Sequence, residues 1–298
     1  MSGLTPRHAL LALAVVAVWG TNFVVIKVAL GHLPPLLFAM LRFTLAAVPG
    51  VFLLRRPKVP LIELAFYGVL IGVGQFGLLF IAMNGHIVPG LASLVVQSHV
   101  FFTIGLAVWL SGERVQPVQW IALAAGAGGL AIIGGHTGGA TSLGGVALVL
   151  AAALAWATGS MVQRRARGVD MIAYVVWASL FTVPPLFILS LVFDGWAAIV
   201  SGVSAAGWTT WAAVGWQAVG NTMFGYGAWG FLLTRYPAAT VAPWSLLVPV
   251  FGIAAAAWWL GEALPPWKLA AGALILSGLA LTLLWPRFAR RYSASVKA

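Results

Sequence analysis

The chain consists of ten long apolar runs, separated from one another by glycine, proline or charged residues. Runs such as LLALAVVAVW and AAAAWWL are apolar on every helical face, whereas a membrane β-strand would alternate apolar and polar residues. A bilayer-spanning helix needs about 20 residues. The pattern therefore predicts an all-α membrane protein with ten transmembrane helices, at residues 8–29, 35–54, 62–83, 89–110, 117–135, 144–163, 171–193, 208–233, 239–260 and 266–285.

Composition excludes a water-soluble globule. Of the 298 residues, 62% are hydrophobic and 7% are charged, against roughly 25% charged residues in a soluble domain. The 16 Lys and Arg with 5 Asp and Glu are too few to form the hydrophilic surface of a nucleic-acid-binding protein. Because the chain has no cysteine, disulfides, thiolate metal sites and a Cys nucleophile are also excluded. We expect neither a metal nor another cofactor.

The first apolar run begins after a basic residue, so a cleaved signal peptide is an alternative for it. We favour a first transmembrane span, because the run stays apolar as far as Ile26 and has a counterpart later in the chain.

Most of the basic residues fall into the connections on one side of the predicted bundle. Cytoplasmic loops of membrane proteins are enriched in Lys and Arg, so this distribution predicts that both termini are cytoplasmic. Of the others, Lys27 and Lys268 lie at span ends, and Arg42 lies within the second span, where a functional and a structural role are both open. The proposed cytoplasmic set is Arg7, Arg55, Arg56, Lys58, Arg114, Arg164, Arg165, Arg167, Arg235, Arg287, Arg290, Arg291 and Lys297.

Two halves of the sequence repeat one pattern, which divides the chain into residues 1–138 and 139–298. A unit of five spans inverts when it is repeated once, because five is odd. We place the extra length of the second half in the connection from Asp194 to Gly207. Glu113 and Glu262 follow a helix-ending Gly and precede a helix-opening Pro, so we interpret them as structural. The repeated residues are Trp19 and Lys27 with Trp156 and Arg164, and Gly112-Glu113, Pro117 and Gly129 with Gly261-Glu262, Pro266 and Gly278.

Three stretches, VWGTNFVVIKVALGHLPPLLFAMLRF, GLASLVVQSHVFFTIGLAVWLSGERV and APWSLLVPVFGIAAAAWWLGEAL, resemble EamA-type members of the drug/metabolite transporter superfamily. Within it, the chain is most similar to bacterial exporters of amino acids and their metabolites, of the O-acetylserine/cysteine and aromatic amino-acid type. The resemblance implies an inner-membrane carrier with two inverted five-span repeats. It also implies a central cavity formed by spans one to four and six to nine, with spans five and ten peripheral.

Polar and aromatic residues inside the spans are the candidates for lining such a cavity, because buried polar groups are costly in hydrocarbon unless they have partners. His99 is the one ionisable residue that we place near the bilayer centre, and either an interhelical hydrogen bond or a transport role would explain it. Pro243 and Pro249 predict a kinked or opened ninth span. The candidate substrate-binding residues are Trp19, Asn22, Gln75, Gln97, Ser98, His99, Trp156, Asn221, Tyr226, Trp229, Trp244 and Ser245.

These features predict a transporter that exports amino acids and related small metabolites by alternating access, with the lipid bilayer as its surroundings and no nucleic-acid partner. No Asp or Glu lies in the middle of a predicted span, so we expect facilitated transport without proton coupling. Proton exchange through His99 is the alternative. Export of lipophilic cations or carriage of nucleotide sugars is possible on the same scaffold, although the former favours a buried carboxylate and the latter clustered cations. The spans contain no motif of an intramembrane enzyme.

Overall fold

The computed structural model describes residues 4–111, 117–163, 166, 168–236 and 238–295. At 111, 234, 238, 239 and 286–295 the description covers the backbone alone. Some of the features predicted above fall outside this description. They are Gly112, Glu113, Arg114, Arg164, Arg165, Arg167, Lys297 and the side chains of Arg287, Arg290 and Arg291.

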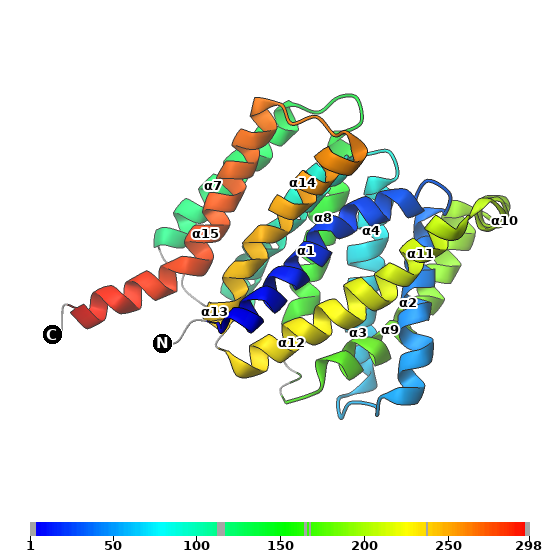
Figure 1. Cartoon of the computed structure of the whole chain (residues 1–298), viewed down its shortest axis with the longest axis horizontal. Helices are drawn as coiled ribbons and strands as arrows, with labels where there is room; N and C mark the ends of the chain where they lie inside the picture. The colour runs from blue at the N-terminus through cyan, green and yellow to red at the C-terminus, as the bar shows by residue number, and fades with distance from the viewer. Residues whose placement is uncertain (1–3, 112–116, 164–165, 167, 237, 296–298) are drawn as a thin grey trace.

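The described chain is a bundle of helices (Figure 1). Within the described residues, nine helical runs are long and apolar enough to cross a membrane, and a bent pair supplies a tenth. Each of the nine, and the Trp208–Leu233 part of the bent pair, agrees with a predicted span to within a few residues, so the all-α membrane fold is confirmed. The helices are α1 (Pro6–Ala29), α2 (Pro35–Leu53), α3 (Leu61–Val69), η1 (Leu70–Gly77), α4 (Leu78–Met83), α5 (Pro89–Val95), η2 (Val96–Ser98), α6 (His99–Ser111), α7 (Pro117–Gly135), α8 (Leu143–Gln163), α9 (Met171–Leu189), η3 (Ser190–Asp194), α10 (Trp196–Ala205), α11 (Trp208–Trp216), η4 (Gln217–Phe224), α12 (Gly225–Arg235), α13 (Ala238–Val241), η5 (Ala242–Leu246), α14 (Leu247–Leu260) and α15 (Pro266–Ser295).

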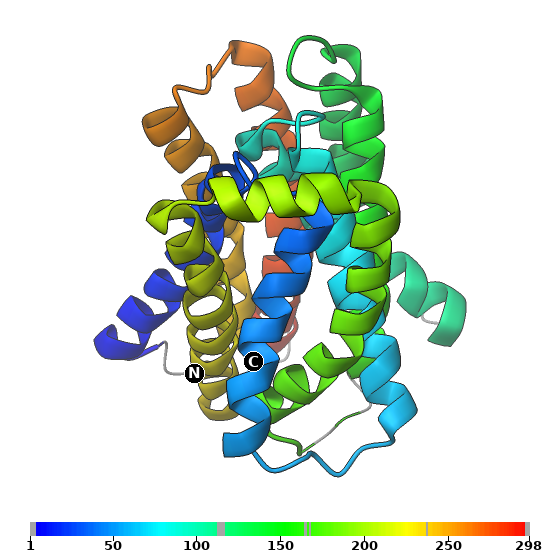
Figure 2. The same cartoon turned by 90° about the vertical axis from the view of Figure 1, so that its right-hand side faces the viewer.

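The stretch from Asp194 to Gly207, expected to be a connection, contains the helix α10. Gly195 has a φ of 81°, which lets the chain turn sharply into this helix. α10 then meets α11 at an angle of 105°. Figure 2 shows α10, in yellow-green, lying across one end of the bundle. Ile199 and Gly202 are its buried residues, and Gly202 lies against the backbone of His32.

The helices pack in a pattern that repeats between the two halves. α1 packs against α14 and against the eighth span, and its counterpart α8 packs against α6 and against the third span. α2 packs against its counterpart α9, and α7 against its counterpart α15. The α7–α15 pair lies at one edge of the bundle (Figure 1), as expected for spans five and ten. α1 begins and α15 ends on the same side of the molecule, at the lower left of Figure 1, as an even number of spans requires.

Irregular helical turns also recur in corresponding spans. A π-helix of eight residues interrupts both the third span, as η1, and the eighth span, as η4. A 3₁₀ turn occurs in both the fourth span, as η2, and the ninth span, as η5. Only the irregularity of the ninth span was predicted, from its two prolines. Such turns leave the regular α-helical hydrogen-bond ladder and are frequent at functional sites.

Glycines bring the third span close to α9. A Cβ atom at Gly68 would collide with the carbonyl oxygen of Ala178, and one at Gly72 would collide with the side chain of Thr182. The hydroxyl of Thr182 donates a hydrogen bond of 2.7 Å to the carbonyl of Gly68. These glycines are therefore packing residues, and they leave Gln75 on the same span free to face elsewhere.

Carboxylates at the ends of spans cap helices of the opposite half. Asp194 accepts a hydrogen bond of 3.0 Å from the backbone N–H of Leu37, in the first turn of α2. Glu262 accepts one of 2.9 Å from the N–H of Gly90, in the first turn of α5, and forms an ion pair of 2.8 Å with Lys268. Negative charge is favourable at a helix N-terminus. Both residues therefore tie the two halves together.

Candidate functional site

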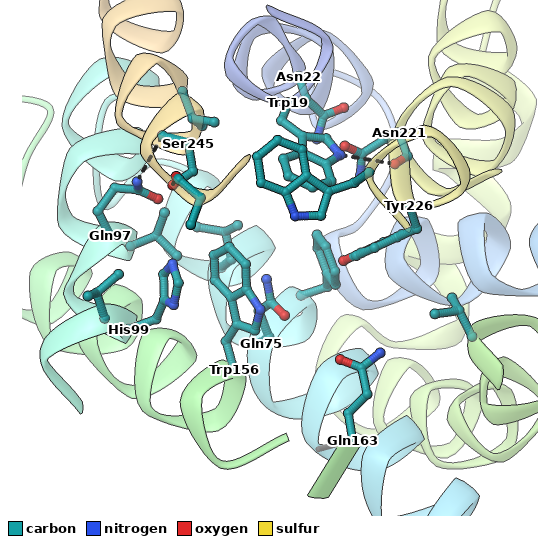
Figure 3. A pocket seen from close by; sticks show the side chains of 18 of the residues that line it. Trp19, Asn22, Gln75, Gln97, His99, Trp156, Gln163, Asn221, Tyr226 and Ser245 are labelled. Carbon is teal, nitrogen blue, oxygen red and sulfur yellow. Dashed lines mark hydrogen bonds between the residues drawn. The ribbon is translucent and has the colours of Figure 1, made fainter. Parts of the chain in front are cut away.

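A cavity of about 410 Å³ lies at the centre of the bundle, between the two halves. All of the candidate residues line it except Ser98 and Trp244. Figure 3 shows that the labelled side chains reach it from the first, third, fourth, sixth, eighth and ninth spans. The candidates that line the cavity are Trp19, Asn22, Gln75, Gln97, His99, Trp156, Asn221, Tyr226, Trp229 and Ser245.

An aromatic cluster from α1 and α12 forms one wall. The ring of Trp19 lies 5.7 Å from that of Tyr226 and 5.2 Å from that of Trp229, centroid to centroid. The indole N–H of Trp19 donates a hydrogen bond of 3.3 Å to the carbonyl of Asn221 (Figure 3). A Cβ atom at Gly225 would collide with this indole. The orientation of Trp19 therefore depends on a glycine one helical turn beyond Asn221.

Three buried side-chain amides form a hydrogen-bonded network next to this aromatic wall. The side-chain N–H of Gln217 donates to the side-chain oxygen of Asn22 at 2.8 Å. The side-chain N–H of Asn221 donates to the side-chain oxygen of Gln217 at 3.4 Å. Asn22 and Asn221 line the cavity, whereas Gln217 is fully buried behind them. Gln217 therefore positions the two amides that a bound molecule could reach.

The facing wall comes from the fourth, sixth and ninth spans. His99 stacks on Trp156, with the ring centroids 3.8 Å apart and the planes inclined by 25°. The side-chain N–H of Gln97 donates to the carbonyl of Ser245 at 3.5 Å (Figure 3). This bond joins η2 to η5, the two 3₁₀ turns. His99 therefore contacts the sixth span by stacking and lines the cavity, while a role in transport stays a prediction.

Polar atoms without partners remain near the cavity. The side-chain oxygen of Gln75 is buried and, among the described residues, accepts no hydrogen bond. The hydroxyl of Ser98 is also buried without a hydrogen-bond partner among the described residues, although Ser98 does not line the cavity. Buried polar groups in native proteins nearly always have a partner. Gln75 therefore offers a bound molecule an acceptor.

Among the described residues, those that line the cavity carry no acidic group, no lysine and no arginine. Within the described residues there is also no cluster of three His, Cys, Asp or Glu residues that could hold a metal. The site is therefore a neutral chamber, with aromatic walls and amide groups that both donate and accept hydrogen bonds.

The cavity extends toward one end of the bundle. Its lining includes Gln163 at the end of α8, Met171 at the start of α9 and Leu233 near the end of α12. At the opposite end of the bundle, Leu33 and Leu91 are 1% exposed, and the hydroxyl of Thr210 lies 3.1 Å from Nδ1 of His32. These residues are therefore closely packed at that end.

Several lining residues were not predicted, and most are apolar. Ile26 lies one helical turn after Asn22, and Leu79 one turn after Gln75, so helical spacing could have identified them. Phe76 follows Gln75 in a π-helix, where neighbouring residues face differently than in an α-helix. Gln163 is polar, but its place at the end of a span made it indistinguishable from an ordinary interfacial residue.

The model of the EamA-like transporter family matches residues 7–135 and 143–284. These two segments fall on either side of the predicted boundary between 138 and 139, which itself stays a prediction. The chain is similar to a solved crystal structure, with a TM-score of 0.62 over 94% of this chain and 98% of that one, at 20% identity. At this identity, the likeness shows the fold alone.

Three relatives match at higher identity than this structure. A probable amino-acid metabolite efflux pump of Salmonella typhimurium is 42% identical over 287 residues, covering 93% of this chain and 94% of that protein. A protein of Escherichia coli K12 with the same description is 39% identical over 300 residues, covering 99% of both. A probable terminal-alkyne amino-acid exporter of Streptantibioticus cattleyicolor is 29% identical, covering 89% of this chain and 90% of that protein.

Proposed function

The chain belongs to the EamA-like transporter family, and we propose that it exports amino acids and related small metabolites through the central cavity. As a member of this family it is a multi-pass membrane transporter and not an enzyme. The amino-acid assignment is supported by the relatives described as amino-acid metabolite efflux pumps, which match nearly the whole chain.

The composition of the cavity is the observation that carries this proposal. A small-molecule site is typically an apolar chamber with a few placed polar groups. The amides of Asn22 and Asn221 can accept from an ammonium group and donate to a carboxylate, and Gln75 adds an acceptor. Trp19, Tyr226 and Trp229 offer an apolar surface for a side chain. A zwitterion with a neutral side chain fits this arrangement.

The position of the cavity supports export. The lining reaches the end of the bundle where α2 ends before Arg55 and α12 ends at Arg235. The excess of basic residues there marks the cytoplasmic side. In this arrangement the substrate enters from the cytoplasm, and release requires the packed end around Leu33 and Leu91 to open. Alternating access between the two halves accounts for both steps.

Transport by this route is driven by the substrate gradient. Proton-coupled carriers commonly use an intramembrane carboxylate, and among the described residues no Asp or Glu lines the cavity. Proton exchange through His99 is the alternative, because His99 lines the cavity. A carrier of lipophilic cations is less consistent with the site, since no carboxylate of the described part of the chain lines the cavity beside the aromatic walls.

The experiment is a flux assay with the purified protein in proteoliposomes, using a panel of radiolabelled amino acids. We expect counterflow of several neutral amino acids above the level of empty liposomes at equal pH on both sides. If no amino acid in a broad panel gives such flux, the proposed substrate class is wrong. If uphill accumulation follows a pH gradient alone, transport is coupled, and the gradient-driven mechanism is wrong.

A further inference from the structure

Arg42 lies near the middle of α2, between the π-helices η1 and η4. Its side chain is 1% exposed. On one side the guanidinium carbon lies 3.8 Å from the ring centroid of Phe76, in η1. On the other side Nη2 donates a hydrogen bond of 2.9 Å to the hydroxyl of Thr222, in η4. The π-helices of the third and eighth spans, which occupy corresponding positions in the two halves, thus both contact Arg42.

The charge of Arg42 is not compensated by the residues around it. Its Nε and Nη1 groups are buried and have no hydrogen-bond partner among the described residues. The one ion pair within the described part of the chain joins Lys268 and Glu262, so Arg42 has no carboxylate of its own. A buried guanidinium without a counter-ion is costly and in membrane proteins marks a functional site.

Arg42 stands directly behind the cavity. Phe76 and Tyr226 line the cavity. Thr222, which accepts the hydrogen bond from Arg42, follows the lining residue Asn221. In this arrangement the ring of Phe76 lies over the guanidinium. Phe76 therefore touches both the cavity and the guanidinium.

We propose that Arg42 is the residue that recognises the carboxylate of the transported molecule, and that Phe76 covers it while the cavity is empty. This inference rests on the proposed function, and it assigns the selection of substrates that carry a carboxylate to one residue. The guanidinium presents its donors in a planar fork that matches a carboxylate in two parallel hydrogen bonds. The attraction between the guanidinium and Phe76 is exchanged for this stronger interaction when substrate binds.

The test compares an amino acid with its carboxamide, which has the same side chain and amine but no negative charge. Transport of the pair is measured in proteoliposomes for the unchanged protein, Arg42→Lys and Arg42→Gln. We expect the unchanged protein to favour the free acid by about tenfold or more, the equivalent of one charge-assisted contact of about 1.4 kcal/mol. We expect this preference to fall in Arg42→Lys, which keeps the charge but loses the fork, and to vanish in Arg42→Gln.

The ratio of the transport rate of the acid to that of the amide separates recognition from folding, because a merely structural role of Arg42 would reduce both transport rates alike. If Arg42→Gln does not fold, Arg42→Lys alone decides, since an undiminished ratio there overturns the proposal. An undiminished ratio in a folded Arg42→Gln protein overturns it as well. If the unchanged protein transports amino acids without preferring the acid, the inference about Arg42 fails and the proposed function stands. If it transports no amino acid, the proposed function itself fails.

Discussion

The contact between Gly225 and Trp19 permits a precise perturbation of the cavity wall. In Gly225→Ala the new methyl group would collide with the indole nitrogen of Trp19, and two further indole atoms would lie 3.1 and 3.2 Å away. The rigid ring has to move as a whole. It would lose its hydrogen bond of 3.3 Å to the carbonyl of Asn221 and its packing on Trp229.

The loss can be expressed as an energy. A hydrogen bond contributes about 1 kcal/mol net, and an aromatic pair about 0.5–1.5 kcal/mol. If substrate binding requires Trp19 in its native position, we expect a cost of about 2 kcal/mol, which weakens binding by more than about tenfold. The measurement is the KM for a transported neutral amino acid in proteoliposomes.

Gly215→Ala is the matched control. Gly215 precedes η4 in the same span, does not line the cavity, and has nothing within 4 Å of its added methyl group. Its KM should stay within about twofold of the unchanged protein. If Gly225→Ala leaves KM unchanged in a protein that folds normally, Trp19 does not form part of the binding surface, and the account of this wall is refuted.

Three further predictions concern single contacts. Gln217→Leu removes the donor to Asn22, leaves a buried amide unsatisfied, and should destabilise the protein by about 1–3 kcal/mol in thermal or denaturant unfolding; an unchanged stability would contradict the network. His99→Phe preserves the stacking on Trp156, so gradient-driven transport should persist at equal pH, whereas loss of flux in a folded variant would favour the proton-exchange alternative. Asp194→Ala removes the cap of α2 and should cost about 1 kcal/mol of stability while KM stays unchanged; a large rise in KM would show that this carboxylate acts on the substrate.

The spans could be predicted from sequence because each is a long apolar run bounded by glycine, proline or charge. Most of the candidate site could be predicted because polar side chains such as Asn22, Gln75 and Asn221 are rare in hydrocarbon and face protein or a cavity. The residues that pack against these side chains are harder to predict from the sequence. The helix α10 was missed because a short apolar segment between spans does not differ in composition from a connection.

Ser98 and Trp244 do not line the cavity, although their neighbours Gln97, His99 and Ser245 do. Each was predicted together with an adjacent residue, and adjacent residues point about 100° apart in an α-helix and about 120° apart in a 3₁₀ turn. Neighbouring residues therefore cannot all face one cavity. Arg42 illustrates a different limit, because its missing partners become visible only when the surrounding side chains are placed.

The absence of cysteine from the chain allows the most direct test of the central claim, that amino acids pass through this cavity. Gly230 lines the cavity and has open space around its Cα, so Gly230→Cys can be accommodated; Gly207→Cys, in an exposed connection, is the control. The measurement is the labelling rate with a membrane-impermeant maleimide, with and without a transported amino acid. The account predicts that substrate slows labelling of Gly230→Cys by reagent added on the cytoplasmic side, and leaves unaffected the labelling of Gly207→Cys by reagent added on the opposite side, where this connection lies. Labelling of Gly230→Cys that no transported amino acid slows would contradict it.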